Sequence, residues 1–105
     1  MVNPGVLRSM RPTARLINVG RGDLVDEDAL VAALRDGVIA GAALDVFATE
    51  PLPAEHPLWS MPNVIVLPHS SGRSSGSDRR AMGIFLDNLA RFEAAEPLTH
   101  QITDL

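Results

Sequence analysis

Residues 16–34, which read LINVGRGDLVDEDALVAAL, contain the change of pattern that decides the fold of this chain. The apolar run Leu16–Val19 has the length of a buried strand and stops at the turn residues Gly20–Gly22. Asp26 then stands as a helix N-cap before apolar residues at helical spacing. The stretch therefore predicts a strand that passes directly into a helix, the place where open α/β sheets carry functional residues.

The same alternation continues on both sides of this stretch. Asn3-Pro4 is typical of a helix start, and Gly37 is typical of a helix end. Strand–helix–strand units of this kind are parallel and right-handed, so we expect an α/β fold with a small parallel sheet and flanking helices. The expected elements are a helix after Asn3 that ends by Pro12, strands over 16–19, 38–47 and 64–69, and helices over 26–37 and 77–92, with loops over 48–63 and 70–76.

Composition excludes several functional classes. The chain has 105 residues, enough for one small domain, and a net charge of -4 without a basic stripe, which argues against a nucleic-acid partner. It contains no cysteine, so disulfides and thiolate metal sites are excluded. No long apolar segment and no signal peptide are found. We therefore expect a cytoplasmic protein with no membrane partner.

Polar residues follow each of the three predicted strands. Arg21 follows the first, Asp45 and then Glu50 follow the second, and His69 follows the third. In a parallel sheet these ends share one edge, so the side chains are expected to converge. Arginine can bind a carboxylate through two parallel hydrogen bonds, and histidine supported by a carboxylate can pass a proton to a carbonyl oxygen. Such a set suits reduction of a 2-keto acid, provided that a cofactor supplies hydride.

Each of these residues also has a plain structural explanation. Arg21 could be a solvated side chain at a strand end, and Asp45 could only cap a turn. Glu50 taken alone is an ordinary loop glutamate, and His69 after a proline could be a hydrogen-bonded turn residue. Asp45, Glu50 and His69 are metal-ligand types but lack tight ligand spacing, so we predict no metal site.

Other polar and aromatic residues are expected to have structural roles. We expect His56 and His100 to be exposed and Trp59 to anchor the long loop to the body of the domain. The acidic residues at Asp23 and 26–28 are interpreted as turn and helix-start residues rather than a cation site. The apolar stripe of the last helix is expected to be core, either in this chain or in a partner chain.

Four segments carry a family resemblance. They are LINVGRGDLVDEDAL (16–30), GAALDVFATEPL (41–52), NVIVLPHSSG (63–72) and FLDNLARF (85–92). In this order and spacing they closely resemble the D-isomer-specific 2-hydroxyacid dehydrogenases, particularly the glyoxylate/hydroxypyruvate reductase and phosphoglycerate dehydrogenase relatives. The resemblance implies the second half of a Rossmann-type NAD-binding domain and NAD(P)-dependent interconversion of a small 2-keto acid and a D-2-hydroxy acid.

The resemblance also implies a role for each site residue. Arg21 would bind the substrate carboxylate and carbonyl, His69 would be the acid/base, and Glu50 would be its hydrogen-bonded partner. NAD or NADP would be the cofactor, with Asp45 holding the nicotinamide carboxamide. The glycines that flank Arg21 are expected to leave room for the dinucleotide. The implied cofactor-binding residues are Val19, Gly20, Arg21, Asp45, His69 and Gly72.

Three family features are missing from the 105 residues. There is no G-x-G-x-x-G phosphate loop, no acidic ribose-binding residue beyond such a loop, and no N-terminal substrate domain. We therefore expect 1–105 to form a single partial NAD-binding domain, with 76–105 as its C-terminal helix and tail. Uncovered strand edges and apolar faces predict a homo-oligomer, which could exchange the last helix. Two alternatives stay open: a catalytically inactive remnant or interaction module, and a subunit completed by a separately encoded partner chain.

Overall fold

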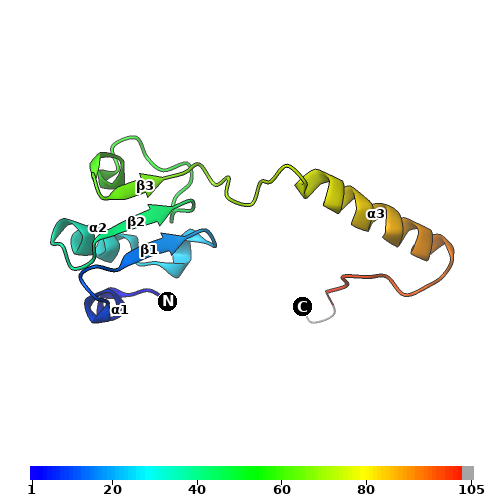
Figure 1. Ribbon diagram of the computed structural model, residues 1–105, viewed down its shortest axis with the longest axis horizontal. Coiled ribbons are helices and arrows are strands. Elements are labelled where there is room, and N and C mark those ends of the chain that lie inside the picture. The colour runs from blue at the N-terminus through cyan, green and yellow to red at the C-terminus, as the bar shows by residue number, and fades with distance from the viewer. Residues whose placement is uncertain (103–105) are drawn as a thin grey trace. The chain divides into compact units, whose positions relative to one another are not determined.

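A computed structural model of the chain describes residues 1–102. The polypeptide divides into two compact units, Met1–Gly72 and Arg73–Leu105, which are described separately below (Figure 1). Within the described residues, no helix is both long and apolar enough to cross a membrane. The helices and strands, with two 3-10 turns named η1 and η2, are α1 (Pro4–Ser9), β1 (Arg15–Asn18), η1 (Gly22–Leu24), α2 (Glu27–Arg35), β2 (Gly41–Leu44), η2 (Pro57–Ser60), β3 (Val64–Val66) and α3 (Ser77–Glu93).

The first unit is built on a three-stranded sheet of order β1-β2-β3. Both strand pairs are parallel, and their register places Ile17 beside Ala43 and Ala43 beside Ile65. The predicted small parallel sheet with flanking helices is thus confirmed. The second and third strands are shorter than the apolar runs that predicted them, because ladder pairing extends only over 41–44 and 64–66.

The predicted helix starts and stops are present. Asn3 caps α1 by accepting a hydrogen bond from the Val6 N–H, and Asp26 caps α2 by accepting one from the Ala29 N–H. Gly37 follows α2 with a φ of 69°, which lets the Val38 N–H reach the Ala33 carbonyl and close the helix end. The first helix ends at Ser9, before the proline that was expected to stop it.

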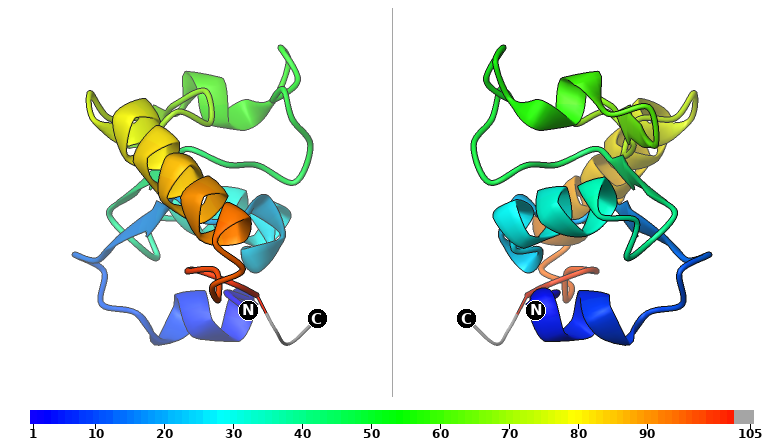
Figure 2. Two further views of the ribbon diagram at one scale, coloured as in Figure 1. Left: turned by 90° about the vertical axis from the view of Figure 1, so that its right-hand side faces the viewer. Right: turned by 90° about the vertical axis from the view of Figure 1, so that its left-hand side faces the viewer.

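The core lies between one face of the sheet and helices α1 and α2, which lie side by side in Figure 2. Leu30 and Leu34 from α2 are almost fully buried there, together with Leu7 from α1. The other sheet face carries Ile17 and Ile65, which are 70% and 62% exposed. Because side chains alternate along a strand and the register aligns the three positions, Ile17, Ala43 and Ile65 lie side by side on this second face.

The second unit consists of α3 and a short tail that folds back along it. Asn88 binds the backbone of Thr99 twice: its Oδ1 accepts from the Thr99 N–H at 2.8 Å, and its Nδ2 donates to the Thr99 carbonyl at 3.2 Å. No residue of α3 is buried. Burial of its apolar stripe, in this chain or in a partner chain, stays a prediction. The exposed apolar side chains of α3 are Met82, Ile84, Phe85, Leu86, Leu89 and Phe92.

Candidate functional site

Three segments leave the carboxyl edge of the sheet, as the parallel topology requires. β2 lies in the centre, so the segments that follow β1 and β3 begin about 10 Å apart, two interstrand spacings. Arg21 follows β1, Asp45 follows β2 directly, and His69 follows β3. The sheet therefore brings these predicted residues to one edge, and the local contacts decide which of them meet.

The turn after β1 is held by Asn18, a buried polar residue that the sequence analysis did not single out. Its Oδ1 accepts from the Gly20 N–H at 3.1 Å, and its Nδ2 donates to the Arg21 carbonyl at 2.9 Å. A lone amide inside an apolar strand run is the sequence signal that could have identified it. Asn18 thus determines where Arg21 leaves the sheet.

The two glycines of this turn, Gly20 and Gly22, have different surroundings. A Cβ at Gly22 would lie 2.0 Å from both the carbonyl carbon and oxygen of Phe47, so glycine is needed for close backbone packing. A Cβ at Gly20 would lie 3.2 Å from the Leu24 side chain. The expectation that Gly22 leaves room for a dinucleotide is therefore wrong, because its open side is filled by the chain itself.

Arg21 is exposed, and its Nη1 donates to the Gly20 carbonyl at 2.8 Å. Within residues 1–102 the guanidinium forms no hydrogen bond or ion pair with Glu50 or His69. Its other N–H groups are available for a carboxylate. The structure places Arg21 at the predicted edge but does not join it to the acid/base pair.

Asp45 is buried, with 1% of its surface exposed, and both of its oxygens are in use. Oδ1 accepts from the Ser70 N–H and Oδ2 from the Ser71 N–H, each at 2.8 Å. Hydrogen bonding from Ser71, followed by that from Ser70, lowers the pKa of Asp45 against the opposing effect of burial. Asp45 therefore stabilises the turn that follows His69, which is the purely structural role considered for it in the sequence analysis. Its contact with a nicotinamide carboxamide stays a prediction.

His69 stands in the left-handed backbone region, with a φ of 52°. This conformation is uncommon outside glycine, and residues held in it concentrate at functional sites. The Asp45 hydrogen bonds to the next two residues and the contact of the ring with Glu50 hold it in place.

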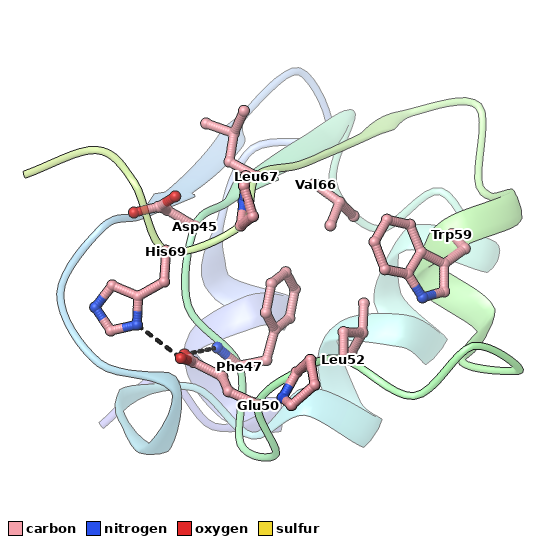
Figure 3. Close-up of a pocket in the computed structure, with 10 residues that line it drawn as sticks. Asp45, Phe47, Glu50, Leu52, Trp59, Val66, Leu67 and His69 are labelled. Atoms are coloured by element: carbon pink, nitrogen blue, oxygen red, sulfur yellow. Dashed lines mark hydrogen bonds and ion pairs between the residues drawn. The ribbon is translucent and has the colours of Figure 1, made fainter. Parts of the chain in front are cut away.

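Glu50 and His69 form the closest polar side-chain pair of the site. His69 Nδ1 lies 2.6 Å from Glu50 Oε2, and the other Glu50 oxygen, Oε1, accepts from the Phe47 N–H at 3.0 Å. The hydrogen bond from His69, followed by that from Phe47, holds the pKa of Glu50 below its ordinary value. An ionised carboxylate is only an acceptor, so Nδ1 carries the proton and Nε2 is left for exchange with another molecule. Figure 3 shows Nε2 on the side of the ring away from Glu50.

A mostly apolar pocket of about 360 Å³ adjoins this pair (Figure 3). Phe47, Leu52, Trp59 and Leu67 line it, and Glu50 and His69 stand at its rim. Trp59 is 54% exposed, and its Nε1 donates to the Pro53 carbonyl within the same loop. Trp59 lines this pocket together with Val66 of β3, so the expectation that it anchors the loop to the body of the domain stays a prediction.

Glu27 and His56 form a second pair that sequence reasoning missed. Glu27 Oε1 lies 3.3 Å from His56 Nε2, and Glu27 Oε2 accepts from the Ala48 N–H at 3.2 Å. The side chains are 17% and 18% exposed, so the expectation that His56 is exposed is wrong. No sequence signal joins residues on a helix start and in a loop 29 positions later. Only the fold brings them together.

The residues present fit only part of a dinucleotide. A Cβ at Gly72 would meet no atom within 4 Å, so the backbone there is open to a ligand. No G-x-G-x-x-G occurs in the 105 residues to bind the phosphates. Within residues 1–102, no three His, Cys, Asp or Glu side chains gather as a metal site.

Residues 1–71 match the family model described as D-isomer specific 2-hydroxyacid dehydrogenase, NAD binding domain. The chain is 48% identical over 89 residues to glyoxylate/hydroxypyruvate reductase B of Yersinia enterocolitica, covering 85% of this chain and 27% of that protein. It is 47% identical over 89 residues to glyoxylate reductase of Thermofilum pendens, covering 85% of this chain and 26% of that protein.

Solved structures show the same similarity. A D-isomer specific 2-hydroxyacid dehydrogenase from Xanthobacter autotrophicus in complex with NADPH and MES superposes with a TM-score of 0.83 at 46% identity, covering 96% of this chain and 41% of that one. An NADPH-dependent glyoxylate/hydroxypyruvate reductase from Sinorhizobium meliloti in complex with NADP and sulfate gives a TM-score of 0.84 at 34% identity, covering 97% of this chain and 33% of that one. The chain spans less than half the length of each of these relatives.

Proposed function

Because the chain belongs to the D-isomer specific 2-hydroxyacid dehydrogenase family, we propose that its carboxyl sheet edge supplies the acid/base and carboxylate-binding groups for NAD(P)-dependent interconversion of a small 2-keto acid and a 2-hydroxy acid. The observation that carries this proposal is the contact of 2.6 Å between His69 Nδ1 and Glu50 Oε2. It leaves the second ring nitrogen free to exchange a proton. Relatives named glyoxylate and hydroxypyruvate reductases support small 2-keto acids as the substrate class.

His69 and Glu50 act together in the proposed reaction. His69 holds a proton at Nε2 and delivers it to the carbonyl oxygen of the keto acid, while the carboxylate of Glu50 stabilises the positive charge of the ring. In the reverse direction Nε2 takes the proton of the hydroxyl group. The cofactor, when bound, supplies the hydride that reduces the carbonyl carbon.

Arg21 binds the substrate carboxylate in this proposal. Its planar guanidinium stays charged and can form two parallel hydrogen bonds to a carboxylate. The spacing of about 10 Å between the ends of β1 and β3 suits an extended arginine and a short keto acid placed between Arg21 and His69. The same charge next to the carbonyl oxygen favours the build-up of negative charge on it.

The nicotinamide end of NAD or NADP is assigned to the same edge. We propose that Asp45 contacts the carboxamide and that backbone at Val19, Gly20 and Gly72 lines the ring. The 105 residues form a partial NAD-binding domain in this proposal, with 76–105 as its helix and tail. The phosphates therefore need residues outside these 105, from further sequence of the same protein, a second copy or a separately encoded partner.

We also propose that the protein assembles as a homo-oligomer. The apolar sheet face around Ile17 and Ile65 and the exposed stripe of α3 support this proposal. Light scattering of the purified chain tests it, and a monodisperse monomer would rule it out. A cytoplasmic location stays a prediction.

Turnover by the purified chain tests the proposed function directly. NADPH oxidation is followed with glyoxylate and with hydroxypyruvate, after calorimetric titration has established whether NADPH binds. His69→Ala is expected to lower turnover about 10²- to 10⁴-fold, the usual contribution of a general acid, while the matched control His100→Ala leaves it unchanged. Unchanged turnover in His69→Ala contradicts the assignment. Absence of NADPH binding by the folded chain favours an inactive remnant or a need for a partner.

A further inference from the structure

The start of the loop that carries Glu50 is held by three contacts at two adjacent peptides. These peptides join Val46 to Phe47 and Phe47 to Ala48, and both Val46 and Phe47 are buried. Gly22 packs so closely against the Phe47–Ala48 peptide that a Cβ there would lie 2.0 Å from the Phe47 carbonyl and 2.5 Å from the Ala48 nitrogen. Glu27 accepts the N–H of the same peptide, from Ala48, at 3.2 Å, and Glu50 accepts the N–H of the preceding peptide, from Phe47, at 3.0 Å.

Glu27 also holds the far part of the same loop. Its second oxygen, Oε1, meets His56 Nε2 at 3.3 Å, while His56 Nδ1 accepts from the Leu58 N–H at 3.4 Å. Since Nδ1 is an acceptor, the ring proton lies on Nε2 and is donated to Glu27. One carboxylate on the first turn of α2 thus ties both the start and the middle of the loop to the body of the domain.

These contacts lead directly to the acid/base pair. The Ala48 N–H that Glu27 holds is adjacent in sequence to the Phe47 N–H that orients Glu50. Glu50 in turn contacts His69 at 2.6 Å. The two peptides share the Phe47 Cα, so movement of the Phe47–Ala48 peptide would change the direction of the Phe47 N–H and with it the position of the Glu50 carboxylate.

We propose that Glu27 and His56 are positioning residues, which hold the loop so that the Glu50 carboxylate stays in contact with His69. The role of Glu50 as partner of the acid/base rests on the proposed function, whereas its position rests on these contacts alone. The Glu27 and His56 side chains are only 17% and 18% exposed, so salt screens their mutual contact less than it screens a fully exposed ion pair.

Glu27→Gln tests the proposal, with Asp28→Asn as its matched control. Both changes remove one negative charge from the first turn of α2, but Asp28 is exposed and has no hydrogen-bond partner among residues 1–102. Glutamine has one oxygen acceptor, so it cannot serve both Ala48 and His56 in the present arrangement. Circular dichroism and thermal unfolding first establish that each variant is folded, and His56→Ala replaces Glu27→Gln if the latter fails to fold.

Three measurements distinguish a Glu27 that positions the Glu50 carboxylate from a Glu27 that only binds the Ala48 amide. In Glu27→Gln, hydrogen exchange at both the Ala48 and the Phe47 amides is expected to accelerate about tenfold, as the loss of a hydrogen bond to a charged group predicts. The Glu50 carboxyl, followed by carbon NMR across a pH titration, is expected to shift its midpoint upward because its partners hold it less firmly. Turnover, where the chain is active, is expected to fall in kcat with little change in the KM for the keto acid. Asp28→Asn should alter none of these.

The outcomes distinguish the two proposals. If only the Ala48 amide accelerates while Phe47 exchange and the Glu50 midpoint stay at their wild-type values, Glu27 merely caps a loop and the positioning role is refuted. If Phe47 exchange and the Glu50 midpoint change but no variant reduces a keto acid, the positioning role stands and the proposed function fails.

Discussion

Replacing Gly22 by alanine should destabilise the chain more than any other single methyl addition at a glycine of the first unit. The new Cβ would lie 2.0 Å from Phe47 carbonyl atoms, whereas ordinary contact begins at 3.4 Å, so the neighbouring peptide must retreat by about 1.4 Å. Overpacking of this kind typically costs about 1–3 kcal/mol. The retreat also separates the Ala48 N–H from the Glu27 carboxylate, a charged hydrogen bond that contributes about 1.5–3 kcal/mol.

The expected loss is therefore about 3 kcal/mol or more, a large share of the stability of a small domain. For a domain of this size it corresponds to a fall in Tm of roughly 12–24 °C. Thermal and urea unfolding, followed by circular dichroism, measure the loss. Gly72→Ala is the control, because a Cβ there meets no atom within 4 Å and its φ lies outside the left-handed region. A Gly22→Ala chain that unfolds at the wild-type temperature would refute the close-packing argument.

Three further results are expected. The pKa values of Asp45 and Glu50 are lowered in the folded protein, so both carboxyls stabilise the fold at a pH above their ordinary pKa values of 3.8 and 4.5. This contribution is lost as the pH falls through the pKa values that the two groups have in the folded protein. The urea midpoint should therefore fall on acidification, and less steeply in Asp45→Asn; an equal slope contradicts this. Trp59, which is 54% exposed, should be readily quenched by acrylamide, whereas protection would indicate that another chain covers it. Asn88→Ala should speed hydrogen exchange at the Thr99 amide about tenfold or more, and unchanged exchange would show that the tail is held by other contacts.

The sequence was sufficient where the evidence is local. Capping by Asn3 and Asp26, the helix end at Gly37 and the order of apolar runs depend on neighbours within a few positions, so pattern alone predicted the parallel sheet and its helices. The convergence of strand ends followed from parallel topology. The pairing of Glu50 with His69 was implied by the family resemblance, and their contact is present in the structure.

Tertiary structure alone decided the contacts between distant segments. Gly22 is required by the backbone of Phe47, 25 residues later, and Glu27 meets His56 across 29 positions. Neither composition nor periodicity contains information on such meetings, because they depend on how α2 and the loop pack on the same sheet. The exposure of Trp59 and the burial of Asp45 are decided in the same way. The sequence by itself determined which side chains reach the sheet edge, and three-dimensional packing decided which of them hold one another there.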